Sequence, residues 1–143
     1  MSSRKRVRSS GQGTLVLDNE GLSRAATDRA MYVRLQAAYL DGRRVVTSAA
    51  ILAEALRGTA RDAGVYRVLG GIVVEPVTQQ IGELAGKLIG AAGLGSGHAV
   101  DAILVATALG EPGPIVIATS DLGDLNALAG DQPHISVVAA DKL

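Results

Sequence analysis

The sequence of 143 residues contains no cysteine, no tryptophan and no phenylalanine, and it has only three tyrosines. The absence of cysteine excludes disulfides, zinc–thiolate sites and thiol catalysis. The shortage of aromatic rings argues against binding single-stranded nucleic acid by base stacking, because that mode needs aromatic platforms. Hydrophobic residues nevertheless make up 48% of the chain, so we expect a folded core of Ala, Val, Ile and Leu.

Long hydrophobic runs are also lacking. No apolar segment is long enough to span a bilayer, and the best one, residues 97–109, is interrupted by Asp101. The charged start of the sequence has no apolar run behind it, so it does not have the pattern of a secretory signal peptide. We therefore expect a cytoplasmic protein that makes no membrane contact.

The net charge is zero, but the charges are unevenly distributed. The first ten residues carry four of the 14 basic groups and no acidic group, so the remainder of the chain has ten basic and 14 acidic groups, a net charge of −4. Bulk charge therefore does not make the body of the protein a nucleic-acid binder. We expect residues 1–12 to form a flexible basic tail and residues 13–143 to form a single domain.

Short apolar runs alternate with helical segments along the chain. A strand that is apolar throughout is buried on both faces, so this alternation predicts a parallel sheet covered by helices on both sides. Ser48, Thr78 and Ser96 are expected to cap helices, and the glycine-rich residues 90–97 are expected to form a loop. The predicted strands are 14–17, 45–47, 72–74, 115–118 and 135–138, and the predicted helices are 22–40, 48–58, 61–69, 78–89, 97–109 and 122–128.

Four acidic residues occur within these apolar segments or at their ends. Asp18 and Asp121 follow the first and fourth predicted strands, whereas Glu54 and Asp101 lie on predicted helices. Carboxylates among apolar residues are costly unless they are compensated, and converging carboxylates are naturally compensated by a divalent cation. Ligands of parallel sheets bind beyond the carboxyl ends of strands where the strand order reverses. If the first and fourth strands are neighbours, Asp18 and Asp121 meet at such a point.

Each acidic residue also has a structural explanation. An aspartate after a strand commonly forms a turn or caps a helix. Glu54 has Arg57 three residues further on, which is the spacing of an ion pair on a helix. The residues alone leave the structural and the functional interpretation open.

Four stretches of the chain, in order, resemble the acidic motifs of PIN domains, and most closely those of the VapC toxins of bacterial toxin–antitoxin pairs. The resemblance implies a three-layer α/β/α fold with a parallel central sheet of strand order 3-2-1-4-5. It also implies a Mg²⁺- or Mn²⁺-dependent endoribonuclease that cleaves RNA phosphodiester bonds with metal-activated water. The four stretches are residues 15–18, 52–58, 100–108 and 118–128.

By position, the resemblance assigns specific residues to the site. Thr119 and Ser120 would orient a carboxylate or a metal-bound water, and a VapB-type antitoxin and a second copy of the chain are the expected partners. Glu20, close behind the first acidic residue, departs from the family pattern and would either add a ligand or disturb the placement of water. The catalytic, metal-binding carboxylates would be Asp18, Glu54, Asp101 and Asp121, with Asp124 as a further metal ligand.

Other functions are weighed against this one. A haloacid-dehalogenase-like phosphatase would need Asp-x-Asp where the chain has Asp18-Asn19-Glu20. A PIN-like module without catalysis would use the same acidic pocket only to bind a basic peptide. The glycines at 93–97 lack the Gly-Lys-Ser/Thr ending of a phosphate-binding loop, and His98 and His134 are expected to have surface or capping roles.

Overall fold

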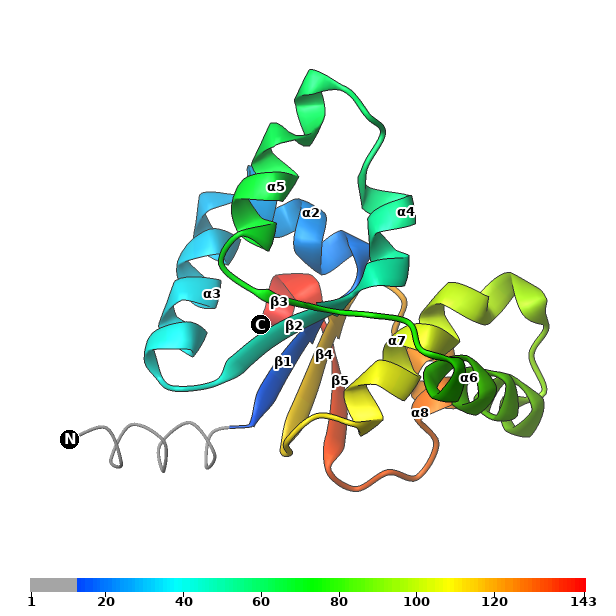
Figure 1. The fold of residues 1–143 in the computed structure, drawn as a ribbon. Helices are drawn as coiled ribbons and strands as arrows, with labels where there is room; N and C mark the ends of the chain where they lie inside the picture. Colours follow the sequence, from blue (N-terminus) through cyan, green and yellow to red (C-terminus); the bar gives the residue numbers. More distant parts are fainter. Residues whose placement is uncertain (1–12) are drawn as a thin grey trace.

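The structure is a computed structural model that describes residues 13–143; the predicted basic tail lies outside these residues. The described residues contain one sheet of five parallel strands in the order β3-β2-β1-β4-β5, which confirms the predicted topology (Figure 1). Parallel pairing follows from the apolar strand sequences, because both faces of such a sheet are buried. The strands are β1 Thr14–Leu17, β2 Arg44–Ser48, β3 Val73–Glu75, β4 Ile115–Thr119 and β5 Ile135–Ala139.

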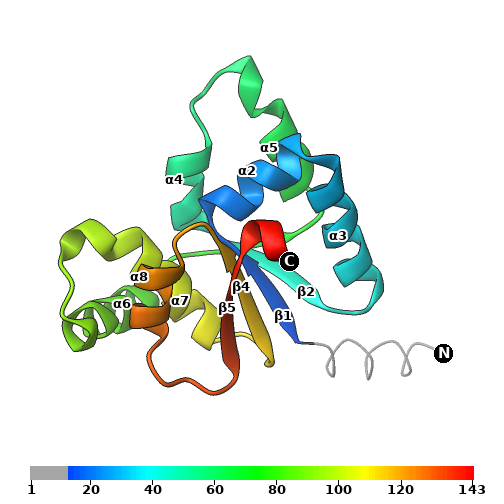
Figure 2. The same ribbon diagram turned by 180° about the vertical axis from the view of Figure 1, so that it is seen from behind.

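Seven α-helices within the described residues cover the two faces of the sheet. Helices α2 to α5 lie on one side, and α6 to α8 pack together on the other side (Figures 1 and 2). This arrangement is the predicted three-layer α/β/α architecture. The helices are α2 Asn19–Thr27, α3 Arg29–Leu40, α4 Leu52–Ala55, α5 Ala63–Leu69, α6 Gln79–Ala92, α7 Ala99–Leu109 and α8 Leu122–Ala129.

The central strand β1 and the helix α7 contribute much of the core. All four residues of β1 are buried, and so are six of the seven residues of α7 from Ala102 to Ala108, Ile103 being half-buried. Small alanine side chains let α7 pack closely on the sheet and on α6 and α8. The strand β1 therefore presents the residue that follows it, Asp18, from a rigid position.

The predicted helix 22–40 is two helices, which is a correction to the sequence analysis. Helix α2 begins at Asn19 because Asp18 caps it, and the side chain of Asp18 accepts a hydrogen bond from the backbone N–H of Gly21. The chain breaks at Asp28, whose side chain accepts a hydrogen bond from the backbone N–H of Ala30 and caps α3. Helical propensity through this region hid the break, and the capping aspartate is the signal that marks it.

Two further boundaries differ from the prediction. The predicted helix 48–58 is a 3₁₀ turn, Ala49–Ile51, followed by the short α4, although Ser48 does cap it as expected. Helix α6 continues to Ala92 and ends at Gly93, whose φ of 69° is the left-handed conformation that glycine adopts readily. Residues 90–92 are therefore helical rather than part of a loop.

The predicted cap of α7 is also wrong. Ser96 lies in a 3₁₀ turn, Ser96–His98, that leads into the helix. His98 occupies the N-cap position and makes no side-chain capping hydrogen bond to the backbone of α7. The imidazole of His98 is consequently free to contact another element.

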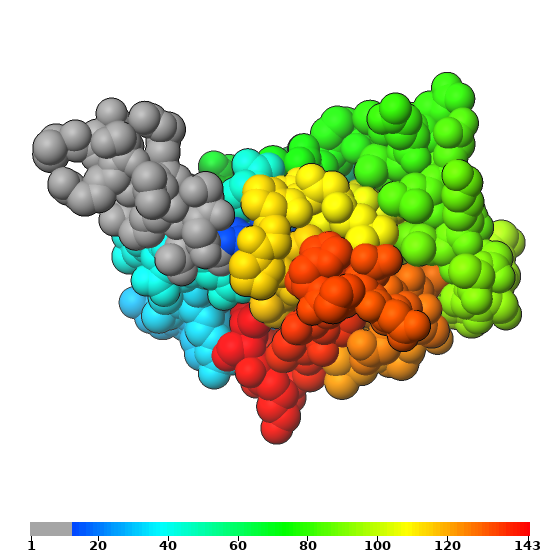
Figure 3. All heavy atoms as spheres, turned by 90° about the horizontal axis from the view of Figure 1, so that it is seen from below, coloured from blue at the N-terminus to red at the C-terminus, as the bar shows by residue number. Residues whose placement is uncertain are grey.

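The connections that enter β4 and β5 lie side by side at the end of the sheet where these strands begin (Figure 3). The backbone N–H of Ile115 donates a hydrogen bond of 2.8 Å to the carbonyl of His134. His134 thus lies at the opposite end of the strands from the residues that follow β1 and β4. Across residues 13–143, no helix is long and apolar enough to cross a membrane.

Candidate metal centre

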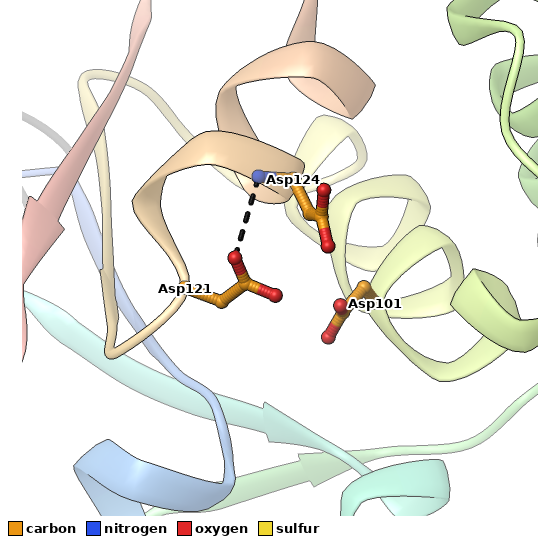
Figure 4. Close-up of side chains that lie close together, drawn as sticks. All are labelled: Asp101, Asp121 and Asp124. Atoms are coloured by element: carbon orange, nitrogen blue, oxygen red, sulfur yellow. Dashed lines mark hydrogen bonds between the residues drawn. The ribbon is translucent and has the colours of Figure 1, made fainter.

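Three carboxylates converge beyond the carboxyl end of β4. Asp121 follows the strand and caps α8, Asp124 lies in the first turn of α8, and Asp101 lies in the first turn of α7. Each offers an oxygen atom, and these atoms all lie within 4.8 Å of one another (Figure 4). The backbone N–H of Asp124 donates a 3.4 Å hydrogen bond to Oδ1 of Asp121, which holds the two residues of α8 together.

Two acids outside the group of three, Asp18 and Glu54, also influence the pKa of Asp101. Burial is the largest cause, and the charges of Asp121, Glu54, Asp18 and Asp124 follow in that order; together they raise the pKa of Asp101 to about 6. Among residues 13–143, no lysine or arginine forms an ion pair with any of the five. The charges of the other four acids therefore act on Asp101, and no lysine or arginine of this part of the chain pairs with any of the five carboxylates.

Asp18 is the most deeply buried of these acids, with 7% of its surface exposed. Its Oδ1 accepts a 2.9 Å hydrogen bond from the backbone N–H of Gly21, and its Oδ2 accepts one of 2.5 Å from Oγ1 of Thr119. Burial raises the pKa of Asp18, and these hydrogen bonds partly oppose that rise. Asp18 therefore caps α2, as its structural interpretation expected, and it also lies close enough to the cluster to raise the pKa of Asp101.

Thr119 links the two strand ends. Its Oγ1 donates to Asp18 and accepts a 2.8 Å hydrogen bond from the backbone N–H of Asp121. Ser120 interacts with Asp18 only through its backbone: a hydrogen bond from the N–H of Ser120 lowers the pKa of Asp18. Ser120 is otherwise exposed. Thr119 thus lies where an orienting residue was predicted, and the hydroxyl of Ser120 makes no described contact with the cluster.

Glu54 is exposed on α4, and neither it nor Asp18 contributes an oxygen to the group of three. The ion pair with Arg57, one structural alternative for Glu54, is not observed; Nη1 of Arg57 instead donates to the carbonyls of Ala53 and Leu56. Asp18 is buried and Asp101 is half-buried, whereas Glu54 and Asp121 are exposed. Apolar neighbours in the sequence do not bury Glu54, because successive residues of a helix point in different directions.

The departure at Glu20 has a local explanation. Glu20 Oε2 accepts a 2.9 Å hydrogen bond from Nε of Arg24, one turn further along α2. This i,i+4 pair is a common surface interaction of helices. The carboxylate of Glu20 therefore pairs with Arg24 on the same helix and does not belong to the group of three acids.

His98 contacts the cluster, which its position in the sequence did not indicate. Its Nε2 lies 3.0 Å from Oδ2 of Asp124, although the two residues are 26 positions apart. No spacing pattern connects a residue at the start of one helix with a residue at the start of another. The contact depends on how α7 packs against α8.

A groove of about 880 Å³ lies away from the acids, at the ends of β2 and β3 where these strands begin. We call it the α3–α5 groove. Tyr39 and Leu40 at its edge are 63% and 71% exposed, which is unusual for large apolar side chains. The residues of α3 and α5 that line it are Tyr32, Leu35, Gln36, Tyr39, Leu40, Arg67 and Val68.

No model of a known protein family matches the chain, and no curated protein matches it in sequence. Solved structures do match it. VapBC2 from Rickettsia felis, bound to a DNA fragment from their promoter, has a TM-score of 0.63 at 11% identity and covers 88% of this chain and 98% of that one. FitAB bound to an IR36 DNA fragment has a TM-score of 0.59 at 18% identity, covering 88% and 94% of the two chains. FitAcB from Neisseria gonorrhoeae has a TM-score of 0.60 at 18% identity, covering 90% and 99%.

The fold and the acidic cluster define an α/β protein with a candidate metal centre at the carboxyl end of its parallel sheet. More specifically, the chain has the PIN-domain fold that the resemblance of its motifs predicted, and it shares this fold with the three solved structures.

Proposed function

We propose that the protein is a metal-dependent endoribonuclease and the toxin of a toxin–antitoxin pair. The observation that carries the proposal is the convergence of Asp101, Asp121 and Asp124 within 4.8 Å on a PIN-domain fold. Carboxylates at such distances that pair with no lysine or arginine of residues 13–143 repel one another, so the site favours a bound cation. An enzyme of this kind would act in the cytoplasm, where its RNA substrate is found.

The donor set fits Mg²⁺ or Mn²⁺. The three carboxylates provide hard oxygen ligands, which these ions prefer, and the chain has no cysteine that would favour a softer metal. Asp101, Asp121 and Asp124 would hold the ion, and Asp18 and Glu54 would add negative charge and further ligands to the same site. When bound, the ion lowers the pKa of a coordinated water and offsets charge on the phosphoryl oxygens.

The protein's own contribution is to hold these carboxylates in place. Thr119 fixes Oδ2 of Asp18 and the backbone of Asp121, so the ends of β1 and β4 keep a constant spacing. Asp101 projects from a helix whose following residues are almost all buried, which limits its movement. By the family resemblance, cleavage would leave a 5′-phosphate and a 3′-hydroxyl.

The α3–α5 groove supports the proposal of a VapB-type antitoxin as partner. The groove combines apolar residues such as Leu35 and Leu40 with Arg43 and Arg67, which form no ion pair within residues 13–143. A protein segment with apolar and acidic side chains would fill the groove and pair with these arginines. Because the groove is separate from the acidic cluster, its occupant is distinct from the RNA substrate.

We also propose that the protein forms a homodimer, by analogy with PIN domains of this kind. Light scattering across micromolar concentrations tests this state. A dimeric mass is expected, and a monomeric mass at every concentration would count against it.

The proposed activity is tested by incubating the purified chain with a mixed RNA substrate. Cleavage should occur with Mg²⁺ or Mn²⁺, stop with chelator and return when the metal is restored. Asp101→Asn should abolish cleavage, whereas the control Asp131→Asn, an exposed aspartate outside the cluster, should retain it. Antitoxin binding without cleavage under any metal would favour the binding module, and phosphate release from a small phosphomonoester would favour the phosphatase.

A further inference from the structure

His98 makes the one described side-chain contact to the carboxylate of Asp124. Its Nε2 lies 3.0 Å from Oδ2 of Asp124, and no other side chain within residues 13–143 hydrogen-bonds to that carboxylate. The Asp124 side chain is 38% exposed and lies in the first turn of α8, where without a partner it would sample several rotamers. A single hydrogen bond thus restricts one of the three clustered acids.

The position of the imidazole is itself constrained. His98 precedes α7 directly, and its side chain is 31% exposed. Its second ring nitrogen, Nδ1, is buried and has no hydrogen-bond partner among the residues that the structure describes. The ring with its proton on Nε2 therefore fits the contact, because Nε2–H donates to the carboxylate and Nδ1 leaves only a lone pair unsatisfied.

The contact joins the two helices that carry the cluster. Asp101 lies three residues after His98 on α7, and Asp124 lies on α8, which packs against α7. Hydrogen-bond partners that hold metal-binding carboxylates commonly change metal affinity by about 10- to 100-fold when they are removed. His98 does not itself belong to the group of donor atoms within 4.8 Å, so it acts through Asp124.

We propose that His98 is a positioning residue: its Nε2–H holds Oδ2 of Asp124 so that the remaining oxygen of that carboxylate faces Asp101 and Asp121. This inference rests on the proposed function, because it assumes that the cluster binds a divalent ion. It adds a residue from outside the acidic motifs to the site.

The test measures Mn²⁺ binding to the full chain by calorimetry, without RNA. His98→Ala should weaken Mn²⁺ binding by about 10-fold or more. His98→Gln, whose amide N–H can take the place of Nε2–H, should restore most of the affinity. In a background of Asp124→Ala, the His98→Ala change should cause no further loss, since its target has been removed.

The outcomes separate this inference from the proposed function. Equal Mn²⁺ affinity of the wild type and His98→Ala would overturn the inference and leave the metal centre intact. A loss of Mn²⁺ affinity in His98→Ala that His98→Gln does not restore would also overturn the inference. So would a loss that is equally large in the Asp124→Ala background, because a purely structural role of His98 would give either pattern. A wild-type chain that bound no Mn²⁺ and cleaved no RNA would instead contradict the proposed function and, with it, this inference.

Discussion

The hydroxyl of Thr119 donates a hydrogen bond to Oδ2 of Asp18, although the two residues are 101 positions apart in the chain. The contact exists because β1 and β4 are neighbours in the sheet and Leu17 is paired with Ala118. The register therefore places the residue after β1 beside the last residue of β4. The same hydroxyl accepts a hydrogen bond from the backbone N–H of Asp121, so Thr119 connects the buried Asp18 with the cluster of three acids.

Thr119→Val should destabilise the protein and reduce RNA cleavage. Valine has nearly the same shape but cannot donate to Asp18 or accept from Asp121, and a buried group left without its partner costs about 1–3 kcal/mol. Denaturant unfolding and an RNA cleavage assay measure the two effects. Thr107→Val is a matched control, because the buried hydroxyl of Thr107 bonds only to the carbonyl of Ile103 in its own helix. Equal activity of the two variants would show that the Thr119 link has no role in the site.

The stability of the metal-free protein should fall as pH rises through the range in which Asp101 titrates. Its pKa is about 6 in the fold against an ordinary value of 3.8, so the folded state retains this proton longer than the unfolded state. Such a group favours folding less as pH rises from about 4 to above 6. In chelator, Asp101→Asn should therefore melt above the wild type at about pH 7.5, by a smaller margin at about pH 5, and close to it below about pH 4.

Added Mn²⁺ should reverse that order. The ion relieves the repulsion around Asp101 in the wild type, so its melting temperature should rise more at the higher pH. Asp101→Asn lacks a ligand and should gain less. A melting difference between the two proteins that does not depend on pH or on metal would contradict the assignment of this carboxyl to the site.

Asp62 should stabilise the turn that follows the helix of Glu54. Its carboxylate accepts backbone hydrogen bonds from Arg57 and Gly58, and the bond from Arg57 is the main reason that its pKa is lowered. A carboxyl with a lowered pKa stabilises the fold above its ordinary value of 3.8 and loses that effect as pH falls through the folded value. Asp62→Asn should therefore unfold at lower denaturant concentration than the wild type at neutral pH, and the difference should shrink in strong acid.

Asp131→Asn serves as the control for this effect, because Asp131 is exposed and makes no described hydrogen bond. Its unfolding midpoint should follow the wild type at every pH. If Asp62→Asn behaved in the same way, the backbone hydrogen bonds to Asp62 would contribute nothing measurable to stability.

Leu40→Asp should weaken binding of the cognate antitoxin without changing stability or RNA cleavage. Leu40 is 71% exposed beside the α3–α5 groove, so burying it against a partner is favourable while replacing it costs the folded chain little. Titration of the purified antitoxin measures the effect, and a loss of about 10-fold or more is expected. Val33→Asp is the control, since Val33 lies on the same helix, is 51% exposed and does not line the groove. Equal losses in both variants would argue against the groove as the docking surface.

The sequence predicted the sheet well because each strand is a short apolar run between helices. The strand order came from the motif resemblance, and the pairing of β1 with β4 confirms it. Helix boundaries were less predictable, since capping competes with propensity: Asp28 divides a continuous helical pattern, and Gly93 rather than Gly90 ends α6. Local patterns therefore indicate element types more reliably than their ends.

The site was predictable only in part. Strand ends place Asp18 and Asp121 by topology, and the structure adds that Asp101 and Asp124 meet Asp121 at close range. The exposure of Glu54 and the contact of His98 with Asp124 could not be predicted. Both depend on how helices are rotated and packed against one another, which a linear pattern of residues does not specify.

On the proposed function, Asp101, Asp121 and Asp124 together bind one divalent ion. A crystal structure of the protein grown with Mn²⁺, with an anomalous difference map, tests this most directly. We expect a strong anomalous peak coordinated by oxygen atoms of these three carboxylates, and no such peak in Asp101→Asn. An ordered Mn²⁺ ion bound only elsewhere, with the three carboxylates turned away from one another, would contradict it.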